Sequence, residues 1–346
     1  MRRFQVLVVG AGAVGLATAR ALARAGRDVA VVEQFRAGHD RGSSHGSSRI
    51  FRLAYEEPEW VRLAQEALPL WRELEAETGV ELLSLPGSLD SGRDPRPLCG
   101  ALERCDASFE LLDPPVVERR FAIRLRGPAV FQPEGGVAWA EQTLAALREG
   151  LSVYEETHAV SITTEDEAVS LQTTRGAMEA VAVVVCAGAW ARPLLATAGI
   201  ELPVKVTRET VTYFALADDA AVPSVIDWAV PEGWPGVQVY ALDAGAGRLK
   251  VGLHRGGVDA DPDDPGEPDE AATALAAEWV SQVFPLADGG PLGSETCLYT
   301  STVDERFVLE RHGRLVVGSA CSGHAFKFVP AVGRRLAALV EEALTS

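Results

Sequence analysis

Three glycines near the start of the chain have the spacing of a phosphate-binding turn. Gly10, Gly12 and Gly15 follow the pattern G-x-G-x-x-G, and an acidic residue, Glu33, comes further along. In such turns the first glycine permits a tight turn, the second lets the backbone approach a pyrophosphate, and the third lets a helix pack closely on a strand. A carboxylate at the place of Glu33 accepts hydrogen bonds from a ribose 2′-hydroxyl, and its charge disfavours the 2′-phosphate of NADP. The predicted chemistry is dinucleotide binding, and these residues alone do not distinguish NAD from FAD.

The segments around these glycines are those that such a turn needs. Residues 4–9 are almost all apolar, which is typical of a buried parallel strand. Residues 13–25 predict an Ala- and Leu-rich helix that ends at Gly26, and residues 28–32 predict a second strand that ends at Glu33. The N-terminus of this helix presents free N–H groups and the positive end of the helix dipole to the phosphates.

Composition limits the class of protein. The chain has 346 residues, enough for a large core and two domains, and 47% of them are hydrophobic. A net charge of −17 argues against nucleic-acid binding. No apolar run reaches the ~20 residues of a membrane span. The first strand begins too early for a signal peptide to precede it, so we expect a cytoplasmic protein.

Two residue types stand out by their number. The five cysteines form no C-x-x-C pair and no metal-ligand cluster, so we expect free thiols and no metal. Among 32 basic residues only Lys205, Lys250 and Lys327 are lysines. Lysine is a compact point charge whose pKa moves readily, so each of the three is a candidate for a site role, with chance survival as the plainer alternative for any one of them.

Patterns further along the chain predict an α/β protein. A dinucleotide-binding domain is expected from residues 1–80, 136–200 and 290–346, interrupted by an antiparallel β-sheet domain from 81–135 and 201–289. The other predicted elements are a helix over 58–78 kinked at Pro69, a strand over 82–89 interrupted by a turn, a strand and helix over 136–147, three strands over 151–185, strands over 204–216, 237–242 and 249–254, an exposed acidic loop over 259–269, a helix over 270–284, strands over 295–300, 307–310 and 315–317, and a helix over 329–344.

Several segments, taken together and in order, resemble one family. They are GAGAVG, GSSHGSSRIFRLAY, CAGAW, RLKVGLH and TCLYTSTVDERFVLERHGRLVVGSACSGHAFKFVPAVG. Their combination is similar to the monomeric sarcosine oxidase family of FAD-dependent amine oxidases, within the D-amino-acid-oxidase-like superfamily, whose members include N-methyltryptophan oxidase and pipecolate oxidase. The resemblance covers essentially the whole chain. It implies that the dinucleotide is FAD, held by a Rossmann-type domain, and that the inserted sheet binds substrate.

The resemblance also implies a covalent flavin. In that family a cysteine in the strand before the D-E-R/H-F segment bonds to the 8α-methyl group of the flavin, and Cys297 stands at that position. The alternative reading of Cys297 is a small buried apolar residue, the usual role of a free cysteine. Cys186 and Cys321 are interpreted as packing residues of the core or near the flavin.

Further roles follow from the same resemblance. Arg52 and Lys327 match the two cations that hold the substrate carboxylate, and Lys250 matches the lysine that promotes reaction of reduced flavin with O₂. A fork-shaped guanidinium and a point charge suit a carboxylate, whereas a salt bridge or a surface cation is the plainer reading of each. A fixed positive charge also stabilises an electron as it moves to oxygen.

His45 and Arg49 resemble residues on the flavin face, and Tyr240 and His254 resemble residues that line the substrate pocket; a hydrogen-bonded core histidine is the plainer reading of His254. The cofactor-binding residues implied by the resemblance are Gly10, Gly12, Gly15, Glu33, Ser43, Arg49, Val160, Gly188, Cys297, Gly318, Gly323 and Lys327.

Three positions depart from the family pattern. Ser44 replaces the first of two adjacent histidines, Ala325 replaces a glycine in S-G-H-G-F-K-F, and Cys321 stands where larger apolar residues are common. These positions leave the identity of the substrate open.

The expected activity is oxidation of a secondary amino acid, N-methyl or cyclic, to its imine, with O₂ reduced to H₂O₂ by a monomer. Three alternatives stay open at this point. One is a flavin dehydrogenase or a tailoring oxidase of the same fold, the second is a nicotinamide-dependent reductase, and the third is a flavin-binding partner without catalysis. The partners expected are a small amino acid and O₂, with no nucleic acid and no membrane.

Overall fold

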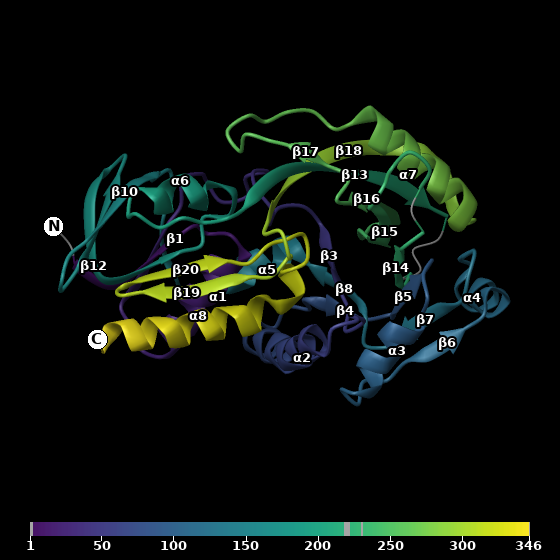
Figure 1. Ribbon diagram of the computed structural model, residues 1–346, viewed down its shortest axis with the longest axis horizontal. Coiled ribbons are helices and arrows are strands. Elements are labelled where there is room, and N and C mark those ends of the chain that lie inside the picture. Colours follow the sequence, from purple (N-terminus) through teal and green to yellow (C-terminus); the bar gives the residue numbers. More distant parts are fainter. Residues whose placement is uncertain (1–2, 218–221, 230, 346) are drawn as a thin grey trace.

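Two large β-sheets lie side by side along the long axis of the molecule, with helices on their outer faces (Figure 1). The computed structural model describes residues 3–217, 222–229 and 231–345. The expected α/β class is confirmed. Within the described residues, no helix is long and apolar enough to cross a membrane.

The first sheet contains the predicted dinucleotide-binding unit. Its order is β10-β11-β12-β1-β2-β9, with β20 on β12 and β19 on β20. The strands are β1 (Arg3–Val9), β2 (Val29–Val32), β9 (Ser152–Tyr154), β10 (Ala159–Thr164), β11 (Val169–Thr173), β12 (Gly176–Val185), β19 (Val308–His312) and β20 (Leu315–Ser319). The pairs among β20, β12, β1, β2 and β9 are parallel. Val6, Leu7 and Val8 are fully buried because helices cover both faces of this parallel region.

The prediction of three strands over residues 151–185 is wrong, because the structure has four strands there, β9 to β12. The chain turns at Glu156, where φ is 50°, and this turn separates β9 from β10. β9 therefore pairs with β2, on the side of the sheet away from β10 and β11. An alternating pattern shows that strands exist but does not show which edge each one joins.

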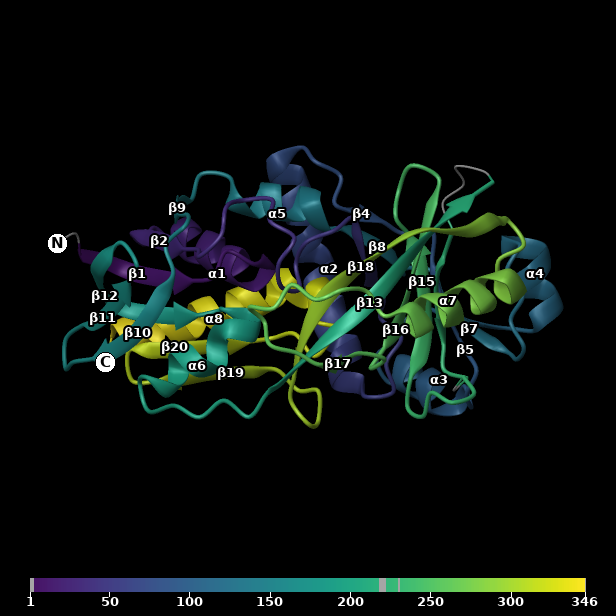
Figure 2. The ribbon, with the colours of Figure 1, turned by 90° about the horizontal axis from the view of Figure 1, so that it is seen from above.

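The two ends of the chain meet in this part of the molecule. Helix α1 (Ala13–Arg24) packs on the C-terminal helix α8 (Val329–Leu344), as Figure 2 shows from above. A Cβ atom at Gly333 would lie 2.8 Å from Ala17, so the glycine permits this close helix contact. Helix α2 (Pro58–Thr78) packs on α8, is joined to α1 by ion pairs, and runs as one helix through Pro69.

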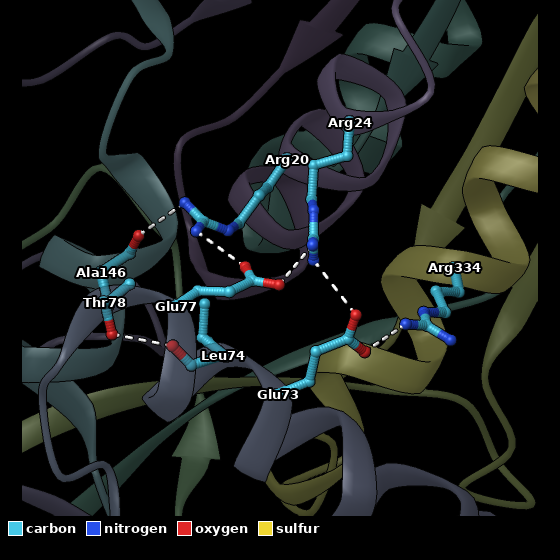
Figure 3. A network of polar contacts seen from close by, with 8 residues as sticks. All are labelled: Arg20, Arg24, Glu73, Leu74, Glu77, Thr78, Ala146 and Arg334. Atoms are coloured by element: carbon cyan, nitrogen blue, oxygen red, sulfur yellow. Dashed lines mark hydrogen bonds and ion pairs between the residues drawn. The ribbon is translucent and has the colours of Figure 1, made fainter.

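A charged network joins the outer turns of these three helices (Figure 3). Arg20 donates to Glu77 at 3.1 Å, and Arg24 pairs with both Glu77 and Glu73. Arg334 of α8 donates to Glu73 from the other side. Because such exposed pairs contribute about 0–1 kcal/mol each, they orient the helices while the buried contacts stabilise them.

The second sheet has nine strands in the order β17-β13-β16-β15-β14-β5-β7-β6, with β18 on β13. They are β5 (Ser88–Ser91), β6 (Glu110–Leu112), β7 (Ala129–Gln132), β13 (Lys205–Leu216), β14 (Ser224–Asp227), β15 (Gln238–Asp243), β16 (Arg248–His254), β17 (Val258–Asp259) and β18 (Ala287–Ser301). Two features differ from the prediction. β14 and β5 pair in parallel in an otherwise antiparallel sheet. β18 pairs along the length of β13, so residues 290–301 lie in this sheet and not in the dinucleotide-binding part.

The two faces of this sheet have different neighbours. Helix α7 (Glu270–Val283) is capped by Asp269, whose side chain accepts hydrogen bonds from two N–H groups of the first turn. Its buried residues pack with Val239 and Val251 on one face of β15 and β16. The alternate residues, such as Tyr240 and Lys250, therefore point to the opposite face.

A small sheet connects the two large ones. It consists of β3 (Ser48–Phe51), β8 (Gly136–Trp139) and β4 (Leu83–Ser84). The remaining elements are α3 (Arg96–Glu103), α4 (Pro114–Phe121), α5 (Ala140–Arg148), α6 (Ala191–Ala196) and the short helices η1 (Gly188–Trp190) and η2 (Phe326–Phe328).

Candidate active site

A single long cavity of about 1440 Å³ runs from the glycine turn of the first sheet to the free face of the second. We call its two ends the glycine-turn end, lined by Gly10, Gly12 and Glu33, and the sheet end, lined by Tyr240 and Lys250. Pockets for drug-sized ligands measure about 300–1,000 Å³, so this cavity suits a larger molecule. Every predicted site residue except Gly15 lines the cavity, namely Gly10, Gly12, Glu33, Ser43, His45, Arg49, Arg52, Val160, Gly188, Tyr240, Lys250, His254, Cys297, Gly318, Gly323 and Lys327.

The turn requires glycine at two of its three positions. Gly10 has φ of 103°, and a Cβ there would lie 2.5 Å from the carbonyl oxygen of Cys186. A Cβ at Gly15 would lie 1.9 Å from the carbonyl oxygen of Gly10. Gly15 therefore lies behind the cavity wall and lets α1 approach the strand, as its place in the motif indicates.

Glu33 is held by the backbone of the turn. Its carboxylate accepts hydrogen bonds from the N–H of Ala11 at 2.7 Å and of Phe35 at 2.9 Å. A carboxylate has about four lone-pair sites, so acceptor capacity remains for a ribose hydroxyl. The two backbone bonds were not predicted, and they fix the side chain at the end of β2.

A contact between the sheets borders the same end. Trp190 packs edge-on against Phe35, with ring centroids 5.4 Å apart. Its Nε1 donates to Asp263 at 2.7 Å, so the acidic loop predicted as merely exposed also reaches the cavity. Val160, a predicted cofactor-binding residue, is 52% exposed and lies on the outer rim.

Positive charge gathers at the sheet end. Arg49 of β3 donates to the carbonyl oxygens of Ser43, His45 and Ser48 at 2.6–2.8 Å. Lys250 of β16 is buried, with Nζ 3.4 Å from the carbonyl oxygen of Ser48. Burial, and then the charge of Arg49, lower the pKa of Lys250 to about 7.

Cys297 lies within this charged region. It is on β18, paired with Glu209 of β13, and its side chain lines the cavity. Burial raises the pKa of the Cys297 thiol, although Arg49 and Lys250 act to lower it. The thiol is therefore protonated in the cavity as it stands.

Arg52 and Lys327, which we call the carboxylate clamp, are both buried and both line the cavity. Arg52 donates to the carboxylate of Asp90 at 3.1 Å and lies 4.3 Å from the ring centroid of Tyr55. Although burial alone would lower it, the Asp90 carboxylate raises the pKa of Arg52. Arg52 therefore forms the salt bridge of the plainer reading and also lines the cavity. The reading of Lys327 as a surface cation is wrong, because Lys327 is 5% exposed.

Sequence reasoning missed Asp90. One of its oxygens also accepts from Nε1 of Trp228 at 3.1 Å, and the other is buried without a hydrogen-bond partner. No local pattern marks this residue, because its partners come from distant parts of the chain and β5 only brings it behind Arg52.

Tyr240 and His254 lie on the free face of the second sheet. A Cβ at Gly252 would lie 2.4 Å from the hydroxyl of Tyr240, so only glycine lets this ring lie across β16. Nε2 of His254 is 3.6 Å from the carboxylate of Glu305, which Arg255 also contacts. Burial alone would raise the pKa of Glu305, but its hydrogen bonds with His254 and Arg255 lower it to about 2. The D-E-R-F segment contained this partner, yet its pairing with His254 was not predicted.

The residues present fit a flavin dinucleotide. The glycine turn and Glu33 suit the nucleotide, and the cavity continues from them to Lys250 and Cys297. Nε2 of His45 is buried in the cavity wall without a hydrogen-bond partner, which leaves one polar atom for a bound group to satisfy. Burial, and then Arg49 and Lys250, lower the pKa of His45 to about 4, so the ring is neutral. The described residues include no cluster of His, Cys, Asp or Glu able to hold a metal.

A family model described as FAD dependent oxidoreductase matches residues 5–339. The chain belongs to this family. Human peroxisomal sarcosine oxidase is 32% identical, with 96% of this chain and 91% of the relative covered. The N-methyl-L-tryptophan oxidase of Salmonella heidelberg is 27% identical, with 96% and 93% covered.

A solved structure agrees over the same length. NikD, described as an unusual amino acid oxidase essential for nikkomycin biosynthesis, is 28% identical with a TM-score of 0.89, and the match covers 99% of this chain and 95% of that one. Family membership confirms FAD as the cofactor and oxidation as the reaction type. The alternative of a nicotinamide-dependent reductase is thereby excluded.

Proposed function

We propose that this protein oxidises the secondary amine of an N-methyl or cyclic amino acid to the imine and passes the electrons to O₂, forming H₂O₂. The observation that carries the proposal is the carboxylate clamp: two buried basic side chains, Arg52 and Lys327, line the same cavity as Lys250 and Cys297. The names of the relatives, sarcosine oxidase and N-methyl-L-tryptophan oxidase, support this substrate class.

Each side chain has a role that its position allows. Bound FAD would accept the hydride equivalent that the amine gives up. Arg52 and Lys327 bind the carboxylate, one as a fork and one as a point charge. Tyr240 and His254 orient the amine from the sheet side, because both line the cavity there. Lys250, in its protonated form, supplies a positive charge for electron transfer to oxygen.

We also propose that the flavin is attached covalently through Cys297. The protein, purified and precipitated with acid, should keep its yellow colour in the pellet, and Cys297→Ala should release the colour to the supernatant. Cys321→Ala is the matched control, since Cys321 also lines the cavity and is only partly buried. Colour retained by the Cys297→Ala pellet would refute the attachment.

Oxidase and dehydrogenase activity differ in the second half of the reaction. We expect fast reoxidation of the reduced enzyme by O₂ and one H₂O₂ per imine formed. Slow reaction with O₂ beside fast reaction with a quinone would assign a dehydrogenase. The likeness to NikD, described as an amino acid oxidase essential for nikkomycin biosynthesis, supports the second candidate, a tailoring oxidase that acts on an imino acid. A panel of sarcosine, L-pipecolate and L-proline separates the two candidates.

We further propose that the protein acts in the cytoplasm as a monomer. The relatives named monomeric sarcosine oxidase support the oligomeric state, with one of them 30% identical over 97% of this chain. Light scattering at several concentrations would give a constant mass, and a mass that rises with concentration would contradict the proposal.

A further inference from the structure

Lys327 is held by neutral groups only. Its Nζ donates to the hydroxyl of Tyr55 at 3.0 Å and to the carbonyl oxygen of His324 at 2.7 Å. In the part of the chain that the structure describes, no carboxylate lies within ion-pairing distance of this nitrogen. Trp71 donates to the carbonyl oxygen of Lys327 at 2.8 Å and fixes the backbone of η2.

The hydrogen bonds of the neighbours have a fixed direction. Nε2 of His324 is 3.1 Å from the carbonyl oxygen of Glu305, which can only accept, so Nε2 carries the hydrogen. Nδ1 of His324 then accepts from the hydroxyl of Tyr55 at 3.2 Å. The oxygen of Tyr55 is left to accept from Lys327. Lys327 therefore has two acceptors, both uncharged.

This count of acceptors matches a neutral amine. A neutral amine has two N–H groups and one lone pair, and the two acceptors use both N–H groups. An ammonium group has a third N–H, which would lack a protein partner in this buried position, and an unpaired buried donor is unfavourable. The lone pair is left for a group in the cavity that Lys327 lines.

The surrounding charges favour the same state. Arg52, in the segment after β3, and Lys327 both lie near the ring of Tyr55, and Asp90 of β5 pairs with Arg52 and offsets part of its charge. Burial, and then the charge of Arg52, lower the pKa of Lys327 well below its ordinary value. Burial raises the pKa of Tyr55, and burial followed by the charge of Lys327 lowers the pKa of His324 to about 3, so both neighbours stay neutral.

We propose that Lys327 is neutral in the ligand-free holoenzyme and takes the ammonium proton of the amino acid substrate when the substrate carboxylate binds. This rests on the proposed function, because it requires an amino acid substrate. One N–H bond of the substrate ammonium breaks, one N–H bond forms at Nζ, and no electrons are exchanged. The total charge of pocket and substrate is unchanged.

One proton transfer then meets two needs of the reaction. The substrate amine becomes neutral, and its lone pair is required when the adjacent carbon gives up a hydride. Lys327 becomes an ammonium group whose third N–H has the substrate carboxylate as its acceptor. The pocket needs no other base for this step.

The scarcity of lysine makes the proposal measurable by NMR. Holoenzyme labelled with ¹⁵N and ¹³C only in lysine has three side-chain amine signals, from Lys205, Lys250 and Lys327. Lys205, 64% exposed in its side chain and paired with Asp259, is the internal reference. Lys327→Met and Lys250→Met assign the other two. At neutral pH we expect the Lys327 signal at the shift of a neutral amine without ligand, and at that of an ammonium group with methoxyacetate, the oxygen analogue of sarcosine.

Calorimetry in buffers of different ionisation enthalpy counts the proton. Methoxyacetate carries no ammonium group, so its binding should take up close to one proton from solvent, whereas sarcosine bound to the anaerobic, chemically reduced enzyme should take up none. The uptake should remain in Lys250→Met and vanish in Lys327→Met. A ligand-free Lys327 already at the ammonium shift, or uptake that persists in Lys327→Met, would overturn the inference. A neutral Lys327 in an enzyme that oxidises no secondary amino acid would instead refute the proposed function.

Discussion

The glycine-turn end of the cavity is built mainly from backbone groups of one short stretch, whereas the sheet end is built from side chains gathered from the whole chain. At the glycine-turn end, Glu33 accepts bonds from the N–H groups of Ala11 and Phe35, all within the first strand–helix–strand unit. At the sheet end, Arg52 meets Asp90, and Lys327 meets Tyr55.

This difference in construction indicates that the two ends of the cavity have different roles. A turn of glycines offers N–H groups that suit any pyrophosphate, so it anchors a cofactor and says little about the reaction. Buried lysines with lowered pKa values, such as Lys250 and Lys327, are costly to keep unless a ligand uses them. The residues at the sheet end therefore determine which reaction the bound cofactor carries out.

The largest effect is expected from Arg52→Met. Removing one partner of a buried ion pair leaves the Asp90 charge uncompensated, which lowers the free energy of unfolding by about 3–5 kcal/mol. The same change should raise KM and lower kcat/KM, because roughly 2–4 kcal/mol of charge-assisted binding to the substrate carboxylate is lost. Urea unfolding and steady-state kinetics measure the two effects. Arg52→Met combined with Asp90→Asn should recover the free energy of unfolding but not kcat/KM. If Arg52→Met alone were as stable as the parent protein, the ion pair between Arg52 and Asp90 would be contradicted.

Lys250→Met should separate the two half-reactions. Loss of one positioned charge slows electron transfer to oxygen on the order of 10²-fold, by analogy with the loss of a single stabilising donor. Anaerobic reduction of the flavin by substrate should keep its rate, because Lys250 is not part of the carboxylate clamp. Stopped-flow absorbance follows both phases. Equal slowing of both would place Lys250 in substrate binding instead.

At the other end of the cavity, Glu33→Gln should weaken nucleotide binding only. A hydrogen bond to a charged group contributes about 1.5–3 kcal/mol, so we expect a rise of about tenfold or more in the dissociation constant of FAD. The measurement needs the Cys297→Ala background, in which the flavin can dissociate. The KM for the amino acid should stay the same. A changed KM with unchanged FAD affinity would reverse the assignment of the two ends.

The smallest effect is a pH dependence of the flavin-free protein. Because the pKa of Lys250 is lowered to about 7, the folded protein loses this proton as pH rises through 7, whereas the unfolded chain keeps it up to the ordinary value of 10.5. The unfolded state binds more protons in this window, so stability increases with pH by about 1.4 kcal/mol per pH unit for one lysine. Lys250→Met should remove its share of this slope in urea unfolding from neutral to alkaline pH. An unchanged slope would mean that Lys250 is charged in the folded protein.

The same contrast decides what the sequence alone could predict. The unit around Gly10, Gly15 and Glu33 is local, so its spacing and periodicity were enough, and β1, α1 and β2 confirm it. Alternation also predicted the strands that carry Tyr240, Lys250 and His254, although only the family resemblance suggested the roles of these residues.

Contacts between residues far apart in the chain could not be predicted from the sequence. The partners Asp90 of Arg52 and Glu305 of His254 depend on how distant strands and loops meet, and no local pattern records that. The same limit explains β9, whose alternating residues predicted a strand but not its pairing with β2, and β18, whose full length appears only against β13.

One measurement tests the central claim, that the sheet end oxidises a secondary amino acid through the flavin. Purified holoenzyme is mixed without oxygen with sarcosine, L-pipecolate or L-proline while the visible absorbance of the flavin is followed, and O₂ is then admitted. We expect that at least one of these amino acids bleaches the flavin in a single turnover and that O₂ restores the colour with formation of H₂O₂. A flavin that stays oxidised with all three, in a protein that binds FAD normally, would show that the sheet end does not oxidise secondary amino acids.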